Sequence, residues 1–219
     1  MTEIEFLSWV RGPGFQIATI VFVGGIVVRL LETLLLGRAP NLAEPKGPAI
    51  SSGFKAIFMR SFSTTGKFRR VMFTLVAGYI FHIGFLVTLF FYAPHILLFK
   101  DVTGLSWPSL PTPIVDALTV VSIIALLAVL VHRLTSKVLR HLSKFEDWLV
   151  WFLTIAPLAT GYIAFHRIGG TAPTLLAIHI LSVELLMIVF PFTKLMHAFT
   201  LFIGRWYNGA MSGYRGVQP

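Results

Sequence analysis

Four histidines fall within two strongly apolar stretches of the sequence, at spacings that suit haem binding. His179 and His197 are eighteen residues apart in the segment 173–203. If that segment is one helix, eighteen residues make five whole turns, so both imidazoles project from one face, about 27 Å apart. Such a pair is too widely separated to share one metal ion. It could instead supply one axial ligand to each of two haems.

The segment 71–99 contains a matching set, His82 and His95, which are thirteen residues or about 20 Å apart along a helix. Because the two segments cross the membrane in opposite directions, His82 matches His197 in depth, and His95 matches His179. Two axial imidazoles leave iron no open site for oxygen chemistry, which suits electron transfer. We therefore expect His82/His197 to hold one haem b and His95/His179 a second. A lone membrane histidine would instead favour a hydrogen bond between helices.

His95 can join such a pair only if its helix bends. On an ideal helix, thirteen residues place His95 about 220° around the axis from His82. Pro94 directly precedes His95 and provides a cause for a kink. His166, at the outer end of the segment 148–165, is the reserve candidate for the outer ligand.

The segments that contain these histidines are apolar enough to cross a membrane. The chain has 219 residues, of which 56% are hydrophobic and 12% are charged, and its mean hydropathy is +0.81. A helical span needs about 20 mostly apolar residues. Five stretches qualify, and they are apolar on every face, unlike the strands of a β-barrel. We predict an all-α membrane protein, residues 1–219 forming a single five-helix bundle with spans at 15–37, 71–99, 114–131, 148–165 and 173–203.

The basic residues indicate the orientation of this bundle. The net charge is +9, but the basic residues are spread between the spans and do not cluster on one soluble face, which argues against nucleic-acid binding. Fourteen of the 18 Lys and Arg residues lie in the connection 38–70, in the connection before the fourth span, and after the last span's centre. By the positive-inside rule, these parts face the cytoplasm and the N-terminus faces outside. We expect a multi-pass protein of the cell's inner membrane, with 38–70 as a cytoplasmic connection.

Other residues fall near the predicted haem sites. Glu184 lies five residues into the membrane from His179, so it must be neutral or paired, and it could relay a quinone proton or form a hydrogen bond between helices. Tyr92, Lys100 and Trp107 lie near the outer haem in this arrangement and could line a quinone pocket. Haem propionates need cationic partners, and the candidates on the inner side are Arg29, Arg70, Arg133 and Lys194.

The segments that contain the histidines resemble a known family. The sequence HILSVELLMIVFPFTKLMH, from His179 to His197, is similar to the last helix of the gamma subunit of respiratory nitrate reductase. That helix has a His, a Phe-Pro-Phe-Ser/Thr-Lys/Arg step and a second His at the same spacing. FHIG at 81–84 is similar to the ligand sequence in the family's second helix. The resemblance implies that His82, His179 and His197 are axial ligands. The fourth position departs from the family, whose second helix-two histidine lies about one turn earlier, where this chain has Tyr92.

In this departure, the chain resembles divergent members of the family, namely the membrane cytochromes that accompany heterodisulfide-reductase-like iron–sulfur proteins. The chain has no cysteine, so any iron–sulfur cluster must belong to a partner. The resemblance implies a di-haem cytochrome b, an electron-transfer subunit that is not an independent enzyme. Such a subunit moves electrons between membrane quinone and a cytoplasmic iron–sulfur partner. The alternative from another class is a haem-free membrane anchor or a proton-relaying transporter.

The distribution of basic residues predicts where the C-terminus lies. A reporter enzyme that works only in the cytoplasm should be active when fused after Pro219, because most basic residues flank the same side of the membrane. If a reporter that works only outside the cytoplasm were active at that position, the predicted orientation would be wrong.

Overall fold

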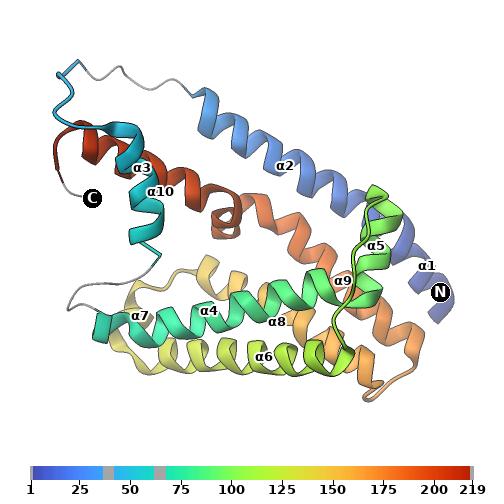
Figure 1. Cartoon of the computed structure of the whole chain (residues 1–219). Coiled ribbons are helices and arrows are strands. Elements are labelled where there is room, and N and C mark those ends of the chain that lie inside the picture. The colour runs from blue at the N-terminus through green and yellow to red at the C-terminus, as the bar shows by residue number, and fades with distance from the viewer. Residues whose placement is uncertain (1, 37–41, 62–67, 218–219) are drawn as a thin grey trace. The chain divides into compact units, whose positions relative to one another are not determined.

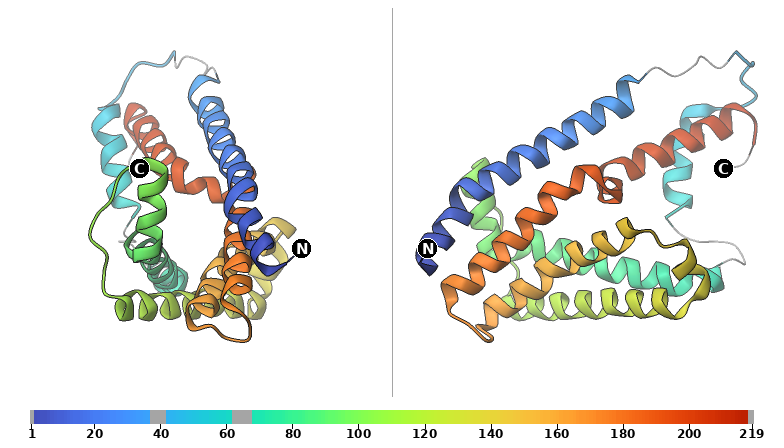
Figure 2. Two further views of the ribbon diagram at one scale, coloured as in Figure 1. Left: turned by 90° about the vertical axis from the view of Figure 1, so that its right-hand side faces the viewer. Right: turned by 180° about the vertical axis from the view of Figure 1, so that it is seen from behind.

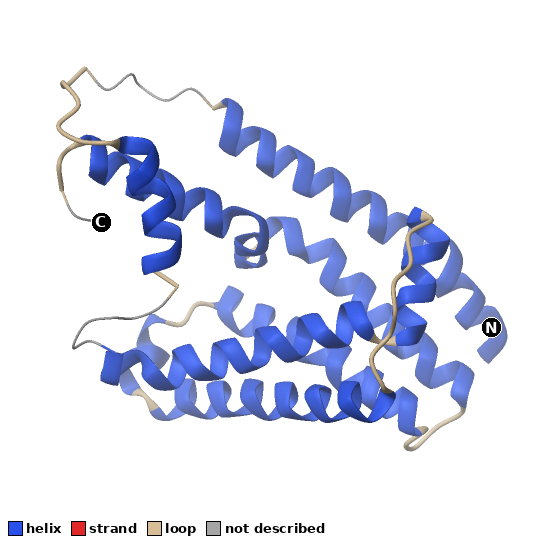
Figure 3. Ribbon diagram, viewed as in Figure 1, coloured by secondary structure: helices blue, strands red, loops and turns tan. Residues whose placement is uncertain are grey.

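The computed structural model describes residues 2–36, 42–61 and 68–217, and within these ranges its regular structure is helical (Figures 1 and 3). Five helical runs in this part of the chain are long and apolar enough to cross a membrane. They are Glu3–Leu35, Met72–Phe91, Thr112–Thr135, Phe145–His166 and Ala172–Phe192. The predicted all-α membrane fold with five spans is therefore confirmed, and a lipid bilayer is the environment of these helices.

The chain divides into two compact units. Unit 1 comprises Met1–Thr19 and Met72–Ile188, and unit 2 comprises Ile20–Val71 and Val189–Pro219. The boundaries cut through the first and the last of the membrane spans. Neither unit is therefore a separate soluble domain.

Unit 1 is built from helices that pack through small and hydroxyl-bearing residues. Gly84 of α4 lies against Ser122 and the Leu118 carbonyl of α6, where a larger residue would collide. The hydroxyls of Thr88 and Thr119 form a hydrogen bond of 3.0 Å between the same helices, which run side by side in Figures 1 and 2. Close approach and interhelical hydrogen bonds are the main sources of helix association in lipid. The elements of this unit are α1 (Glu3–Trp9), η1 (Val10–Gly14), α4 (Phe68–Phe91, from Met72), α5 (Ala93–Thr103), α6 (Thr112–Thr135), α7 (Lys137–Leu142), α8 (Phe145–His166) and α9 (Ala172–Val189, to Ile188).

Unit 2 contains most of α2 (Phe15–Leu35), then α3 (Ala49–Met59), two short 3-10 helices and α10 (His197–Tyr214). The helices α3 and α10 cross closely, because Gly209 and Gly213 of α10 lie against Ala56 and Ser52 of α3. The Lys46 amide also donates to the Tyr214 carbonyl at 2.8 Å. The predicted connection 38–70 thus contains a helix that packs on the C-terminal helix.

The last predicted span, 173–203, is wrong as a single helix. The α-helix α9 ends at Val189, and two 3-10 turns, η2 (Phe190–Phe192) and η3 (Lys194–Met196), follow it. Pro191 has no N–H and its ring clashes with the preceding turn, so it ends the α-helix. Since no continuous helix joins His179 to His197, the argument from five whole turns does not apply.

The second predicted span also ends early, at Phe91 and not at residue 99. Tyr92 has an extended backbone (φ −80°, ψ 127°) and caps the new helix α5. Pro94 lies in the first turn of α5, where its missing N–H has no helical partner in any case. The break therefore lies three residues before His95, in the region where the sequence predicted a bend.

The crossing of α3 and α10 predicts a difference between two glycines of the same helix. Gly209→Ala should lower stability by about 1–3 kcal/mol, because its methyl group would meet Ala56 and the Ser52 carbonyl. Gly204→Ala is the matched control, since a Cβ there would meet nothing within 4 Å. Thermal unfolding in detergent measures both variants. Equal melting temperatures for the two would contradict the close crossing.

Candidate functional site

Unit 1 brings two of the four predicted haem ligands together. The imidazole rings of His95, on α5, and His179, on α9, have centroids 6.3 Å apart and planes inclined by only 19°. Two imidazoles on opposite sides of one metal ion, each at a bond length of about 2 Å, would have ring centroids about 6 Å apart. The observed separation therefore suits an iron atom between the rings.

The hydrogen bonds of His179 select the tautomer that binds a metal through Nε2. Its Nδ1 lies 3.3 Å from the Thr160 hydroxyl, and that hydroxyl donates its proton to the Ala156 carbonyl at 2.7 Å. Nδ1–H is therefore the donor to Thr160, and the lone pair of the ring lies on Nε2. Gly161 makes room for the ring, because a Cβ there would lie 3.0 Å from the His179 Cε1 atom.

His95 has the same tautomer for a simpler reason. Its Nδ1 lies 3.0 Å from the carbonyl of Thr88, in the last turn of α4. A carbonyl oxygen accepts but never donates, so Nδ1 bears the proton and Nε2 bears the lone pair. The last turn of α4 thus orients the His95 imidazole at the start of α5.

The other two predicted ligands share this feature. Nδ1 of His82 lies 2.6 Å from the Gly78 carbonyl, and Nδ1 of His197 lies 2.7 Å from the Lys194 carbonyl. Each imidazole therefore carries its lone pair on Nε2. His82 belongs to unit 1 and His197 to unit 2, and their pairing stays a prediction.

Aromatic residues predicted to line a quinone pocket lie on or near α5, and one of them contacts His95. The Tyr92 ring meets the His95 ring edge to face at a centroid distance of 5.1 Å and also contacts Phe165 at 6.1 Å. Trp107 donates its indole N–H to the Phe90 carbonyl at 2.6 Å and lies near the Phe99 ring. Of the residues predicted to line a quinone pocket, Tyr92 thus contacts a candidate ligand directly. Lys100 lies exposed farther along α5.

Glu184 lies beside a different part of unit 1. It is only 3% exposed, and both of its carboxyl oxygens lie 3.1 Å from the position that a Cβ on Gly14 would occupy. Gly14 ends the π-helix η1, which contains Pro13. Among the described residues, Glu184 Oε1 has no hydrogen-bond partner. His179 faces α5 and α8, whereas Glu184 faces the N-terminal helical run. The role of Glu184 at a quinone site stays a prediction.

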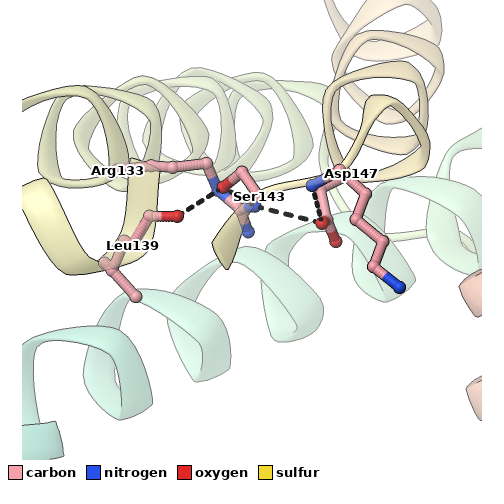
Figure 4. A network of polar contacts seen from close by, with 5 residues as sticks. Arg133, Leu139, Ser143 and Asp147 are labelled. Atoms are coloured by element: carbon pink, nitrogen blue, oxygen red, sulfur yellow. Dashed lines mark hydrogen bonds and ion pairs between the residues drawn. The ribbon is translucent and has the colours of Figure 1, made fainter. Parts of the chain in front are cut away.

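The predicted propionate-binding cations lie in varied surroundings. Arg133 donates to the Ser143 hydroxyl at 2.9 Å and lies 3.8 Å from the Asp147 carboxylate, which joins the end of α6 to the start of α8 (Figure 4). Arg29 pairs with Glu32 at 2.8 Å. Lys194 is exposed in η3. The side chain of Arg70 lies outside the described residues.

An ion pair that the sequence did not single out joins α6 to α8. His166 Nε2 lies 3.0 Å from Asp116 Oδ1. The available signal was an acidic residue near the start of a span that is otherwise apolar, but fifty positions separate the partners. Only the packing of the two helices shows that they meet.

No cluster of three or more metal-ligating side chains occurs within the described residues. A haem needs only two ligands from the protein, because the porphyrin supplies the other four. Two imidazoles of the required tautomer at the required separation therefore form a donor set that fits a b-type haem.

The fold defines a multi-pass membrane protein, and one relative shows its family. The chain is 32% identical, over 210 residues, to a protein of Nitratidesulfovibrio vulgaris strain Hildenborough whose name is simply "Protein". The match covers 92% of this chain and 91% of the relative, so the chain belongs to the same family. No model of a known protein family matches the chain, and no solved structure matches it.

The buried carboxyl of Glu184 leads to a prediction about stability. Glu184→Met should stabilise the protein by about 1–3 kcal/mol, because it removes a buried polar group with an unsatisfied oxygen. Glu184→Gln is the control, since it keeps a polar group of the same shape and should change stability little. Thermal unfolding in detergent measures both. A loss of stability in the Met variant would mean that the carboxyl group has a binding partner.

Proposed function

We propose that this chain is a di-haem cytochrome b subunit that carries electrons between membrane quinone and a cytoplasmic iron–sulfur partner. The observation that supports the proposal is the pair His95 and His179, with ring centroids 6.3 Å apart and Nδ1 of each ring in a hydrogen bond, which places the lone pair of each ring on Nε2. The resemblance of the segments around His82, His179 and His197 to the nitrate reductase gamma subunit supports it.

In this proposal the chain's own residues hold and orient two haems. His95 and His179 bind the outer one, and His82 and His197 bind the inner one. A bound haem supplies a centre that exchanges one electron at a time. Thr88 and Thr160 orient the outer imidazoles through Nδ1, as hydrogen-bond partners of metal-bound histidines commonly do. A haem held by two imidazoles would favour electron transfer over oxygen chemistry.

The remaining parts of the proposal follow from the charge distribution and the resemblance. The N-terminus lies outside and the C-terminus in the cytoplasm of a cell's inner membrane. Quinone reaches the protein from the bilayer near Tyr92 and Trp107. The connection 38–70, with the described helix α3, docks an iron–sulfur subunit similar to heterodisulfide reductase. The chain is thus one subunit of a quinone-linked oxidoreductase.

One observation favours the haem-free alternative. The Thr160 hydroxyl joins His179 to Ser182 through contacts of 3.3 and 2.9 Å, and such a network could link helices or relay a proton without iron. The haem-free alternative predicts a colourless protein, because a protein without haem has no absorption bands in the visible range. The proposed cytochrome would be coloured.

Substituting the histidines one at a time tests the proposal. The purified wild-type protein should contain about two haems b per chain by pyridine haemochrome assay. The variants His95→Ala and His179→Ala should each lose the same haem, and His82→Ala and His197→Ala the other, because each haem keeps only one axial ligand.

His132→Ala is the matched control, since His132 packs against Phe73 and is not assigned to iron. It should keep both haems. Retention of both haems in His179→Ala would contradict the ligand assignment, and a colourless wild-type protein would overturn the proposed function.

A further inference from the structure

The ion pair between His166 and Asp116 has the geometry of a proton-accepting site. His166 ends α8 and Asp116 lies in the second turn of α6, with 3.0 Å between Nε2 and Oδ1. A carboxylate oxygen only accepts, so Nε2–H donates to Asp116 and the lone pair of the ring lies on Nδ1. A carboxylate in this position orients the imidazole and stabilises the positive charge that forms when Nδ1 takes a proton.

Aromatic rings connect this pair to the candidate haem ligands of unit 1. The centroid of the Phe165 ring lies 4.9 Å from that of His166 and 6.1 Å from that of Tyr92. The Tyr92 centroid in turn lies 5.1 Å from that of His95. The Tyr162 and His166 rings also have centroids 4.3 Å apart. Flat aromatic and apolar walls with a few polar groups are typical of sites for ring-shaped ligands.

The pair also lies near the ends of two spans. His166 is the last residue of α8, Asp116 lies in the second turn of α6, and their side chains are 35% and 30% exposed. At such a helix end, a proton on Nδ1 can pass to water at the membrane surface. Glu184, which is 3% exposed, lacks such an exit.

We propose that His166 is the general base that takes protons from a membrane quinol, and that Asp116 is its positioning residue. The assignment rests on the proposed function. Oxidation of a quinol breaks two O–H bonds and releases two protons and two electrons. In turn, each proton forms an N–H bond at His166 Nδ1 and leaves to water. A haem held by His95 and His179 would supply the acceptor for the two electrons, one at a time. Quinone reduction would use the same residues in reverse.

A purely structural role explains the pair less well. Exposed ion pairs contribute only about 0.2–1 kcal/mol to stability. The helices α6 and α8 have a separate connection, because the Trp151 indole donates to the Leu126 carbonyl at 3.0 Å. Variants of the ion pair should therefore fold.

The titratable and charged groups around His166 limit what a pH profile can report. Within the described part of unit 1, the groups that face it are Asp116 from α6, Tyr162 from its own helix and, beyond Phe165, Tyr92. Arg167 follows it in the chain. None of these neighbouring groups is of a type that ordinarily changes charge between pH 5 and 8, whereas an imidazole is.

The test uses the full chain in lipid nanodiscs with three variants, His166→Gln, Asp116→Asn and the control His132→Gln. Haem content and reduction by dithionite come first and should equal those of the wild type in all three. The rate of haem reduction by a naphthoquinol is then measured from pH 5 to 9. Binding of a hydroxyquinoline N-oxide, a quinol analogue, is measured by fluorescence titration and needs no turnover.

We expect the wild-type rate to rise with pH as an imidazole becomes able to accept a proton. His166→Gln should lower the rate about 100-fold and flatten the profile, and it should weaken binding of the N-oxide about tenfold. Asp116→Asn should keep the rise with pH but lower the rate, because the imidazole loses the carboxylate that orients it. His132→Gln should behave like the wild type.

An unchanged rate, pH profile and N-oxide affinity in His166→Gln would overturn the assignment while leaving the proposed function in place. A wild-type protein without haem, seen in the first spectrum before any variant is made, would overturn the proposed function itself. A flat profile in His132→Gln as well would also overturn the assignment to His166.

Discussion

Polar groups in the hydrocarbon of a bilayer have no water to bind, so each must find its partner within the protein. The histidines of this chain follow that constraint closely. His82, His95 and His197 each direct Nδ1 at a backbone carbonyl, and His179 directs its Nδ1 at the Thr160 hydroxyl. The hydrogen bond at Nδ1 thus fixes the tautomer and places the lone pair of the ring on Nε2, the atom through which such an imidazole could bind a metal.

The same constraint explains why the helices break where they do. A carbonyl at the end of a helix still has an unused lone pair, and the break at Tyr92 brings His95 to the Thr88 carbonyl in that last turn. The break after Val189 places His197 against the Lys194 carbonyl. Pro94 and Pro191 cause these breaks, and each lies within six residues of a histidine.

Close packing through small residues allows these polar contacts to form. Gly84 lets α4 approach α6, and Gly161 leaves room beside α8 for the His179 ring. In unit 2, Gly25 of α2 accommodates Pro191, which is fully buried. Since lipid gives helices no hydrophobic reason to associate, such close approaches supply much of the packing energy. Gly84 and Gly161 therefore help to position the helices that carry the candidate site.

Composition alone determined that this is an all-α membrane protein with five spans, because no helix of about 20 apolar residues is stable in water without a partner. Periodicity did not determine the path of the last helix, since counting residues assumes a continuous helix and Pro191 ends it. Depth and Pro94 predicted from the sequence that His95 pairs with His179, and the two rings do meet. Only the tertiary structure directed Glu184 at Gly14 and joined Asp116 to His166. Contacts between residues far apart in the chain depend on how two helices rotate and approach, and that is decided by packing that no local pattern contains.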